Sequence, residues 1–332
     1  MGTEDDLYDN LEEGENNTDT LLHHFLPVPY SITCVLGLMG NVLILAVFVR
    51  YEKIKTMTDT FLVNLAIADI LFLLTLPFLA YEAAHSWVFG EIMCKIIRGA
   101  YRINLYTSML ILTSITFDRF ISITNATKAN KYRVTKQKWR CGVCICLWAL
   151  ALLLAIPQFL YSTTKGENKC FEVFELSIMQ LVVVSLQMIV GFLLPLVSMI
   201  FCYSFILRTL VNARGVQKKK SMKIIVAIVV MFIATQLPYN SLVLALALNN
   251  GLHQKKSFFQ ICIIMEAVAY FHACLNPVLY FFVGTKFRKY FWKMLNALGL
   301  KKVAEETSDN LRGTDGESKN ISATTNLNVT SV

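Results

Sequence analysis

Four ionisable residues lie inside stretches that are otherwise long and apolar, toward one end of those stretches. A charge in such surroundings is costly unless an opposite charge compensates it, so these residues are candidates for function. Arg98 and Arg102 are one helical turn apart on one face, and we expect Glu82 or Glu266 to neutralise one of them. The set predicts a ligand pocket; the alternative is a static ion pair that only fixes packing. The residues expected to line the pocket are Glu82, Trp87, Arg98, Tyr101, Arg102 and Glu266.

A second polar group lies deeper in the same stretches and contains the acid Asp69. A carboxylate in an apolar environment needs hydrogen-bond donors around it. We therefore expect Asp69 to belong to a buried polar network. Its expected members are Asp69, Asn104, Ser108, His272 and Asn276.

The stretches that carry these residues are membrane helices by composition. The chain is 55% hydrophobic and only 16% charged. Its apolar runs are long enough to cross a bilayer and are apolar all round, whereas helices of a soluble core show a polar face with a period of 3.6 residues. The predicted fold class is an all-α membrane protein, a seven-transmembrane helix bundle. The expected spans cover roughly 26–50, 57–84, 91–124, 138–161, 176–210, 221–248 and 258–283.

The third of these spans carries polar residues at intervals along its whole length. From Cys94 to Arg119 it rises about 37 Å at 1.5 Å per residue, against a hydrocarbon core of about 30 Å. Cys94 is therefore expected at one membrane face and the pair Asp118-Arg119 at the other. Such a helix suits a protein that carries a conformational state across the membrane.

Lysine and arginine in the short loops predict the orientation. The segments 50–55, 128–140, 208–220 and 286–293 are basic and lie on one side of a seven-span bundle, which makes that side cytosolic. The segment 1–25, whose first twenty residues hold eight acids and no lysine or arginine, is then extracellular. It has neither a basic nor an apolar leader, so the first span is expected to act as its own insertion signal.

The chain divides into four expected parts. An acidic disordered tail (1–25) precedes the transmembrane domain (26–284). Residues 285–298 alternate apolar and basic side chains, which predicts a short amphipathic eighth helix on the inner membrane surface. Residues 299–332 form a polar cytoplasmic tail that is expected to be disordered.

Cysteine positions predict one disulfide. Cys94 and Cys170 are the cysteines placed at the outer ends of elements, where both face an oxidising space, so we expect a bridge between them. Cys141, Cys144 and Cys146 lie close together in sequence, as the ligands of a metal site often do. However, no histidine or carboxylate accompanies them and they begin an apolar run. We expect no metal there.

Two kinds of modification site are expected on opposite sides of the membrane. Asn16 begins an Asn-Asn-Thr sequence in the outer tail and is the expected glycosylation site. The inner tail offers hydroxyls whose phosphates would bind a basic groove. These are Thr307, Ser308, Ser318, Ser322, Thr324, Thr325, Thr330 and Ser331.

Short motifs in all seven spans, taken in order, resemble the rhodopsin-like G-protein-coupled receptors. They are Gly40-Asn41, Asn64-Leu65-Ala66-Ile67-Ala68-Asp69, Asp118-Arg119-Phe120, Trp148, Pro195 with Tyr203, Pro238, and Asn276-Pro277-Val278-Leu279-Tyr280. Further motifs resemble the chemokine receptors within that group. They are Thr75-Leu76-Pro77, Trp87-Val88-Phe89-Gly90, Glu266, and Phe271-His272-Ala273-Cys274-Leu275-Asn276-Pro277. Four others resemble most closely the CXC branch of these receptors: Asp118-Arg119-Phe120, Ala126-Thr127-Lys128-Ala129, Thr235-Gln236-Leu237-Pro238 and Phe287-Arg288-Lys289.

This resemblance implies a basic chemokine as ligand, which the acidic tail would attract electrostatically. Tyr8, set among acids, looks like a tyrosine-sulfation site, and Glu266 corresponds to the family's ligand anchor. Likeness to the CXC branch suggests a membrane-anchored CXC chemokine. Leu79 stands where the family often has tryptophan, which changes the expected shape of the minor subpocket.

In the membrane interior the resemblance implies a structural sodium ion and a hinge. Asp69, Asn104, Ser108 and Asn276 would hold hydrated sodium in the inactive state; the alternative is a water network without metal. Pro238 kinks span six because it removes a backbone hydrogen bond. Gln236 stands where most of the superfamily has a tryptophan switch, so activation is expected to pass through other contacts, hydrogen bonds of Gln236 among them.

At the inner face the resemblance implies a switch formed by Asp118, Arg119, Tyr203 and Tyr280. Arg119 would pair with Asp118 in the inactive state and turn toward the two tyrosines in the active one. The implied partners are an inhibitory-class heterotrimeric G protein, arrestin and, through Thr330-Ser331-Val332, a PDZ protein.

Two alternatives to a signalling receptor stay open from the residues. Phe120 after the Asp-Arg pair and the missing span-six tryptophan allow an atypical scavenging receptor that binds chemokine without G-protein output. A transporter or channel is remote, because the span count is odd and inverted repeat halves are not visible. An enzyme is not expected, since the sequence has no nucleophile–base pair or metal-ligand set.

Overall fold

The computed structural model describes residues 23–50, 54, 56–124, 129–164, 169–174, 176–212, 216–249, 256–283 and 292–293. The chain separates into two compact units, Met1–Val283 and Gly284–Val332. In the second unit the description covers only Trp292 and Lys293, which are helical. The predicted eighth helix at 285–298 otherwise lies outside the described residues.

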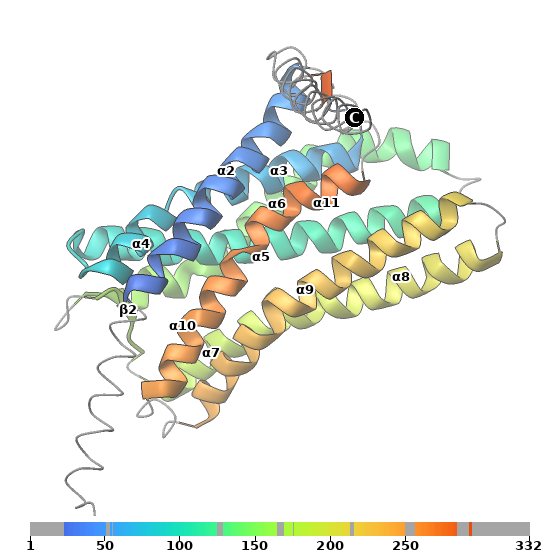
Figure 1. Cartoon of the computed structure of the whole chain (residues 1–332). Coiled ribbons are helices and arrows are strands. Elements are labelled where there is room, and N and C mark those ends of the chain that lie inside the picture. The colour runs from blue at the N-terminus through green and yellow to red at the C-terminus, as the bar shows by residue number, and fades with distance from the viewer. Residues whose placement is uncertain are drawn as a thin grey trace, which may run out of the picture. The chain divides into compact units, whose positions relative to one another are not determined.

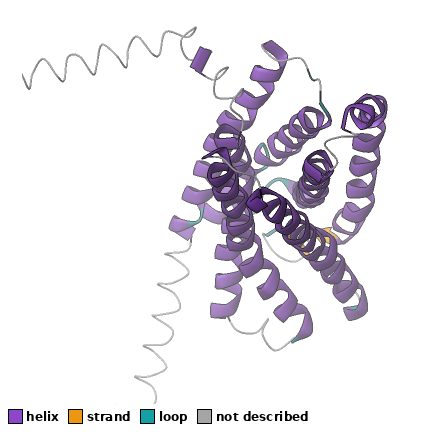
Figure 2. Cartoon of the chain, turned by 90° about the vertical axis from the view of Figure 1, so that its right-hand side faces the viewer, coloured by secondary structure: helices purple, strands orange, loops and turns teal. Residues whose placement is uncertain are grey.

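The first unit is a bundle of long helices (Figures 1 and 2). The helices are α2 (Pro27–Arg50), α3 (Met57–Leu73), α4 (Leu76–Ala84), α5 (Gly90–Thr124), α6 (Ala129–Tyr161), α7 (Ser177–Met188), the π-helix η1 (Ile189–Leu193), α8 (Leu194–Asn212), α9 (Val216–Leu248), α10 (Lys256–Tyr270) and α11 (His272–Val283). Spans two, five and seven of the sequence analysis are thus each interrupted, at α3–α4, at η1 and at α10–α11.

Proline chemistry explains the first of these interruptions. Pro77 lies in the first turn of α4 and has no backbone N–H to continue the ladder of α3. The Thr75 hydroxyl instead donates to the Phe72 carbonyl at 2.6 Å, so the carbonyl at the end of α3 keeps a donor. Span two is therefore broken into two helices at this proline.

Six helical stretches in the described residues are long and apolar enough to cross a membrane. The third predicted span, α5, is not among them, although it is a continuous helix of 35 residues. The reason is its composition, because Glu91, Lys95, Arg98 and Arg102 fall in its first half. The charged residues of α5 that are candidates for function also lower the hydropathy by which a membrane span is recognised.

Helix α5 is the central element of the bundle and packs against α3, α6, α8 and η1 (Figure 1). At Gly99 it packs closely against α6, because an added Cβ there would lie 2.2 Å from the ring of Phe159. Trp148 on α6 donates its indole N–H to the Asn64 side chain of α3 at 3.0 Å. Two motif residues thus tie the membrane-facing helix α6 to the centre.

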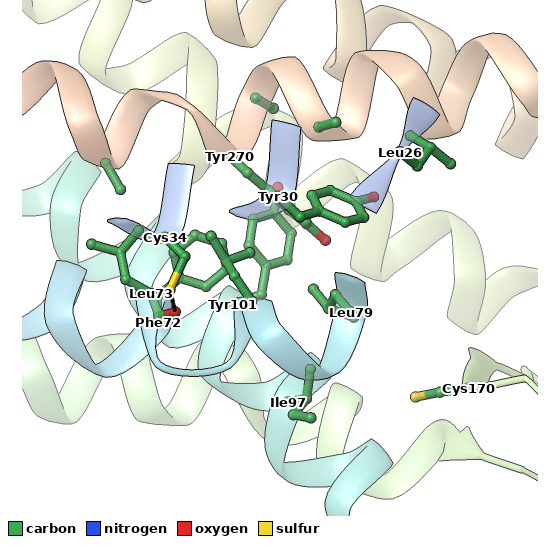
Figure 3. Close-up of a cluster of buried hydrophobic side chains, with 14 of the residues drawn as sticks. Leu26, Tyr30, Cys34, Phe72, Leu73, Leu79, Ile97, Tyr101, Cys170 and Tyr270 are labelled. Atoms are coloured by element: carbon green, nitrogen blue, oxygen red, sulfur yellow. Dashed lines mark hydrogen bonds between the residues drawn. The ribbon is translucent and has the colours of Figure 1, made fainter. Parts of the chain in front are cut away.

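The largest buried cluster lies toward the outer end of the bundle and is rich in aromatic rings. Figure 3 shows Tyr30, Tyr101 and Tyr270 close together beside Phe72. The ring centroids of Tyr101 and Tyr270 are 4.7 Å apart, and those of Phe72 and Tyr270 are 5.1 Å apart. Edge-on contacts of this kind add to simple burial and fix the ring positions.

Two details differ from the sequence-based expectation. Residues Ser162–Thr163 and Phe171–Glu172 form a short antiparallel hairpin, β1 and β2, so the outer loop is not free of strands (Figure 2). Helices α6 and α9 begin at Ala129 and Val216, earlier than the expected 138 and 221. Hydropathy marks only the part of a helix that lies in lipid, which is why these extensions were missed.

Candidate ligand pocket and signalling core

A disulfide joins the start of α5 to the outer hairpin. Cys94 and Cys170 are bonded, with their Cα atoms 5.5 Å apart and 76 positions between them in sequence. The predicted bridge is confirmed. It places β2 directly over the outer half of α5, where the charged residues lie.

Glu82 and Arg98 both bind the backbone of Cys170. The Cys170 N–H donates to Glu82 Oε1 at 2.6 Å, and Arg98 Nη2 donates to the Cys170 carbonyl at 2.8 Å. The acid comes from α4 and the base from α5. Two charged side chains that the sequence suggested for ligand contact therefore also hold the loop that contains Cys170.

Glu266 on α10 is the acid that pairs with Arg98. Its Oε1 lies 3.5 Å from Arg98 Nη1 and accepts from the Tyr270 hydroxyl at 2.7 Å and from the Tyr239 hydroxyl at 3.5 Å. The expectation that Glu82 or Glu266 neutralises one arginine is thus met by Glu266 and Arg98. A carboxylate among tyrosine rings is a fitting receptor for a cationic group, since both the charge and the ring faces attract it.

Arg102 has a partner that the sequence analysis did not name. Its Nη2 lies 3.5 Å from Glu172 Oε1 on β2, and its Nη1 donates to Gln187 Oε1 on α7. Its guanidinium also lies 5.5 Å from the centroid of the Tyr101 ring. The signal available in the sequence was an acid two residues after the bridging Cys170, since the bridge brings that acid over α5.

Trp87, Leu79 and Tyr101 are buried in the outer cluster. The indole N–H of Trp87 donates to the Gly90 carbonyl at 2.9 Å, and the ring of Phe89 packs edge-on against it at 5.2 Å. Gly90 begins α5 with φ of 77°, the left-handed region that glycine adopts readily. Trp87 thus supports the corner before α5 from within the cluster.

The deeper polar residues form the expected network around Asp69. Its Oδ1 accepts from Asn104 Nδ2 at 2.9 Å and from the Ser108 hydroxyl at 3.5 Å. Its Oδ2 accepts from Asn276 Nδ2 at 2.8 Å. His272 Nδ1 donates to the Ala269 carbonyl at 2.7 Å rather than to Asp69. The network joins α3, α5 and α11.

At the inner end the description covers part of the predicted switch. Asp118 accepts from the Thr58 hydroxyl at 2.9 Å, which ties α5 to α3. The Thr116 hydroxyl lies 3.5 Å from that of Tyr203 on α8 and donates to it. The side chains of Arg119 and Tyr280 lie outside the described residues.

The hinge residues of span six lie inside the unbroken helix α9. Gln236 is buried, and its Nε2 donates to the Ala269 carbonyl at 3.3 Å, next to the break between α10 and α11. Pro238 lies two residues further on, within the helix. Gln236 thus connects the hinge of span six with the interruption of span seven.

The remaining predicted positions fall outside the described residues. These are Tyr8, Asn16, Thr307, Ser308, Ser318, Ser322, Thr324, Thr325, Thr330 and Ser331. Sulfation, glycosylation and phosphorylation at them stay predictions.

Comparison with known proteins agrees with this fold. Residues 40–280 match the family described as 7 transmembrane receptor (rhodopsin family). The chain is 41% identical over 286 residues to human C-C chemokine receptor type 7, covering 83% of this chain and 76% of that protein. It is 40% identical over 287 residues to human C-C chemokine receptor type 6, covering 82% and 77%. The bovine type 7 receptor is 42% identical, with 83% and 76% covered.

A bundle of membrane helices with a charged cluster at its outer end, a polar core and a match to the rhodopsin-family model over residues 40–280 defines a rhodopsin-family membrane receptor. Within that family, the chain belongs to the chemokine receptors. It is a multi-pass plasma-membrane receptor and not an enzyme, and α5 is its third span despite its low hydropathy. The predicted orientation, with the N-terminus outside, is that of this family.

The subclass suggested by the motifs and the names of these relatives differ. Four motifs resemble most closely the type 6 receptor of the CXC branch: Asp118-Arg119-Phe120, Ala126-Thr127-Lys128-Ala129, Thr235-Gln236-Leu237-Pro238 and Phe287-Arg288-Lys289. The relatives found here carry C-C names at about 40% identity. Such identities establish the family and not the ligand subclass.

Proposed function

We propose that the chain is a signalling receptor for a basic chemokine and couples to an inhibitory-class G protein. The observation that carries this is the arrangement at Glu266. Its carboxylate lies among Tyr239, Tyr270 and Arg98 at the outer end of the bundle, directly beneath the loop held by Cys170. A cationic ligand group at this carboxylate acts on the pocket and the loop together.

The acidic outer tail supplies the first step. Eight acids in the first twenty residues attract a basic protein and raise its rate of encounter, more strongly at low salt. Sulfation of Tyr8 adds a fixed negative charge, and a glycan on Asn16 keeps the segment in water. These steps need no ordered structure in the tail.

The second step takes place at the Arg98–Glu266 pair. A basic side chain or amine of the ligand competes with Arg98 for the Glu266 carboxylate, because both are cations. Arg98 then keeps only its bond to the Cys170 carbonyl and to groups of the ligand. In this way a local exchange of ion pairs shifts α5 relative to α10.

The inner end delivers the output. Asp118 and Tyr203 lie there on α5 and α8, and Arg119 and Tyr280 belong to the same end by sequence. Arg119 turning toward the tyrosines opens the G-protein site, and phosphates on the inner tail recruit arrestin. The end Thr330-Ser331-Val332 fits a PDZ domain.

A structural sodium ion fits the network around Asp69. Sodium prefers oxygen ligands, and Asp69 and the Ser108 hydroxyl supply oxygens within one cluster. The side-chain oxygen of Asn104 is buried there without a hydrogen-bond partner among the described residues, which suits a water or cation. Asp69, Asn104, Ser108 and Asn276 would hold the ion and thereby stabilise the inactive state.

The test is a G-protein activation assay in cells that express the full-length receptor. The panel contains CXC chemokines, including membrane-anchored ones, and C-C chemokines, because the motifs and the relatives point to different subclasses. We expect one ligand class to activate the wild type, Glu266→Gln to lose potency, and Arg119→Ala to bind ligand without output. Uptake of chemokine with no G-protein response would replace this proposal by a scavenging receptor.

A further inference from the structure

A continuous chain of polar side chains runs from the outer hairpin to the hinge of α9. Glu172 on β2 pairs with Arg102 on α5 at 3.5 Å, and Arg102 donates to Gln187 on α7. Gln187 Nε2 donates to Asn240 Oδ1 on α9 at 3.1 Å. Asn240 Nδ2 in turn donates to the Gln236 carbonyl at 2.7 Å. Neither Gln187 nor Asn240 was singled out by the sequence.

The middle of this chain is buried. Arg102, Gln187, Asn240 and Gln236 are all shielded from solvent. Hydrogen bonds in such surroundings are stronger than in water, and breaking one leaves a buried group without a partner. A change at Arg102 is therefore not absorbed by solvent but has to be accommodated by the next side chain.

This chain of polar side chains contacts α9 and span five where these helices are least regular. The bond from Asn240 to the Gln236 carbonyl bridges Pro238, the residue without a backbone donor. Gln187 lies just before η1, a π-helical segment in which the backbone ladder changes register. Such segments change conformation more readily than a regular α-helix. The polar side chains therefore connect two places where a helix can bend, Pro238 in α9 and η1.

We propose that Gln187 and Asn240 are positioning residues that couple Arg102 to the angle of α9 at Pro238. The proposal rests on the proposed function in that the ligand is a basic protein. A basic side chain of the ligand that pairs with Glu172 leaves Arg102 with Gln187 and the Tyr101 ring. Arg102 then reorients, Gln187 follows, and Asn240 releases or tightens its hold across Pro238. This route takes the place of the tryptophan switch of span six, where this chain has Gln236.

The first experiment measures the position of α9 without any ligand or G protein. Spin labels on non-canonical amino acids at Ile145 of α6 and Val230 of α9, both exposed, report their distance in full-length receptor in nanodiscs. Asn240→Leu and Gln187→Met each cut the same link, and loss of one ordinary hydrogen bond implies an about fivefold change in the ratio of the two α9 positions. Glu172→Gln, which mimics loss of the ion pair to a ligand, is expected to shift the ratio in the same direction.

The matched control is Gln158→Leu on α6. Gln158 is equally buried, but neither of its polar side-chain atoms has a hydrogen-bond partner among the described residues. We expect it to leave the distance distribution unchanged. A distribution that is the same in Asn240→Leu, Gln187→Met and wild type overturns the proposal. So does failure of both link variants to fold while Gln158→Leu folds, since that result shows a purely structural role.

The second experiment separates this inference from the proposed function. Ligand-free nucleotide exchange on a purified inhibitory-class G protein is measured for the same variants. We expect the exchange rate to change about fivefold along with the α9 distance ratio. A distance change without any nucleotide exchange in wild type or variants would contradict the G-protein coupling and leave the relay standing.

Discussion

Glu82 and Arg98 bind opposite polar groups of the same residue, Cys170, one accepting from its N–H and the other donating to its carbonyl. The disulfide fixes the side chain of that residue, so its N–H, its carbonyl and its sulfur are all bonded to other parts of the protein. Glu82 and Arg98, which the sequence suggested for ligand contact, thus also hold the outer loop at Cys170 in place. Under the proposed function, a ligand group that displaces Arg98 would therefore also act on the loop that contains Cys170.

The first prediction concerns this arrangement. Arg98→Met removes the donor to the Cys170 carbonyl and leaves the Glu266 carboxylate without its cation, so we expect a loss of about 3 kcal/mol in stability. Glu82→Gln keeps an acceptor for the Cys170 N–H and is expected to cost less than about 1 kcal/mol. Thermal unfolding of the purified receptor measures both. Equal losses in the two variants would show that charge, not hydrogen-bond geometry, dominates.

The second prediction concerns close packing at Gly99. A Cβ there would lie 2.2 Å from the Phe159 ring, so Gly99→Ala forces α5 and α6 apart and is expected to cost about 1–3 kcal/mol. Phe159→Leu in the same chain should recover part of the loss. Gly142→Ala is the control, because an added Cβ there meets nothing within 4 Å. In a helix interior it should be neutral or stabilise by about 0.5–1 kcal/mol. Thermal unfolding that ranked Gly142→Ala below Gly99→Ala would contradict the packing argument.

Much of this fold follows from the sequence because its signals are local. Seven apolar spans, the basic inner loops and the Cys94–Cys170 pair are each visible within one stretch or through one compartment rule. The network around Asp69 also followed, since a buried carboxylate needs donors and few polar residues lie at its depth.

The relationships that the sequence did not show depend on how helices rotate against one another. Gln187 and Asn240 are single amides in apolar runs, and only the packing of α7 against α9 brings them within 3.1 Å. Glu172 reaches Arg102 because β2 folds back over α5, a turn that no hydropathy pattern contains. The breaks within spans five and seven are not marked by hydropathy either, whereas Pro77 marks the break within span two.

The third prediction concerns the disulfide. The double variant Cys94→Ser, Cys170→Ser frees the outer hairpin and is expected to lose about 2–5 kcal/mol of stability. Reductant should lower the unfolding temperature of the wild type and leave that of the double variant unchanged. Cys146→Ser, at an exposed free cysteine, is the control and should behave as the wild type does. A wild type insensitive to reductant, or a destabilised Cys146→Ser, would argue against this account.

The last prediction tests whether the network around Asp69 binds sodium. A cation that binds the folded receptor and not the unfolded chain stabilises it in proportion to RT ln(1 + [Na⁺]/Kd). The wild type should therefore unfold at a higher temperature in sodium chloride than in N-methylglucamine chloride of equal ionic strength. Asp69→Asn keeps the size of the side chain but removes the charge, and Ser108→Ala removes the oxygen 3.5 Å from the carboxylate, so both should lose this difference. Thr60→Ser, whose hydroxyl donates to the Thr56 carbonyl away from the network, should retain it. An equal sodium effect in Asp69→Asn would place the ion elsewhere, and no effect in the wild type would leave Asp69 at the centre of a network of hydrogen bonds alone.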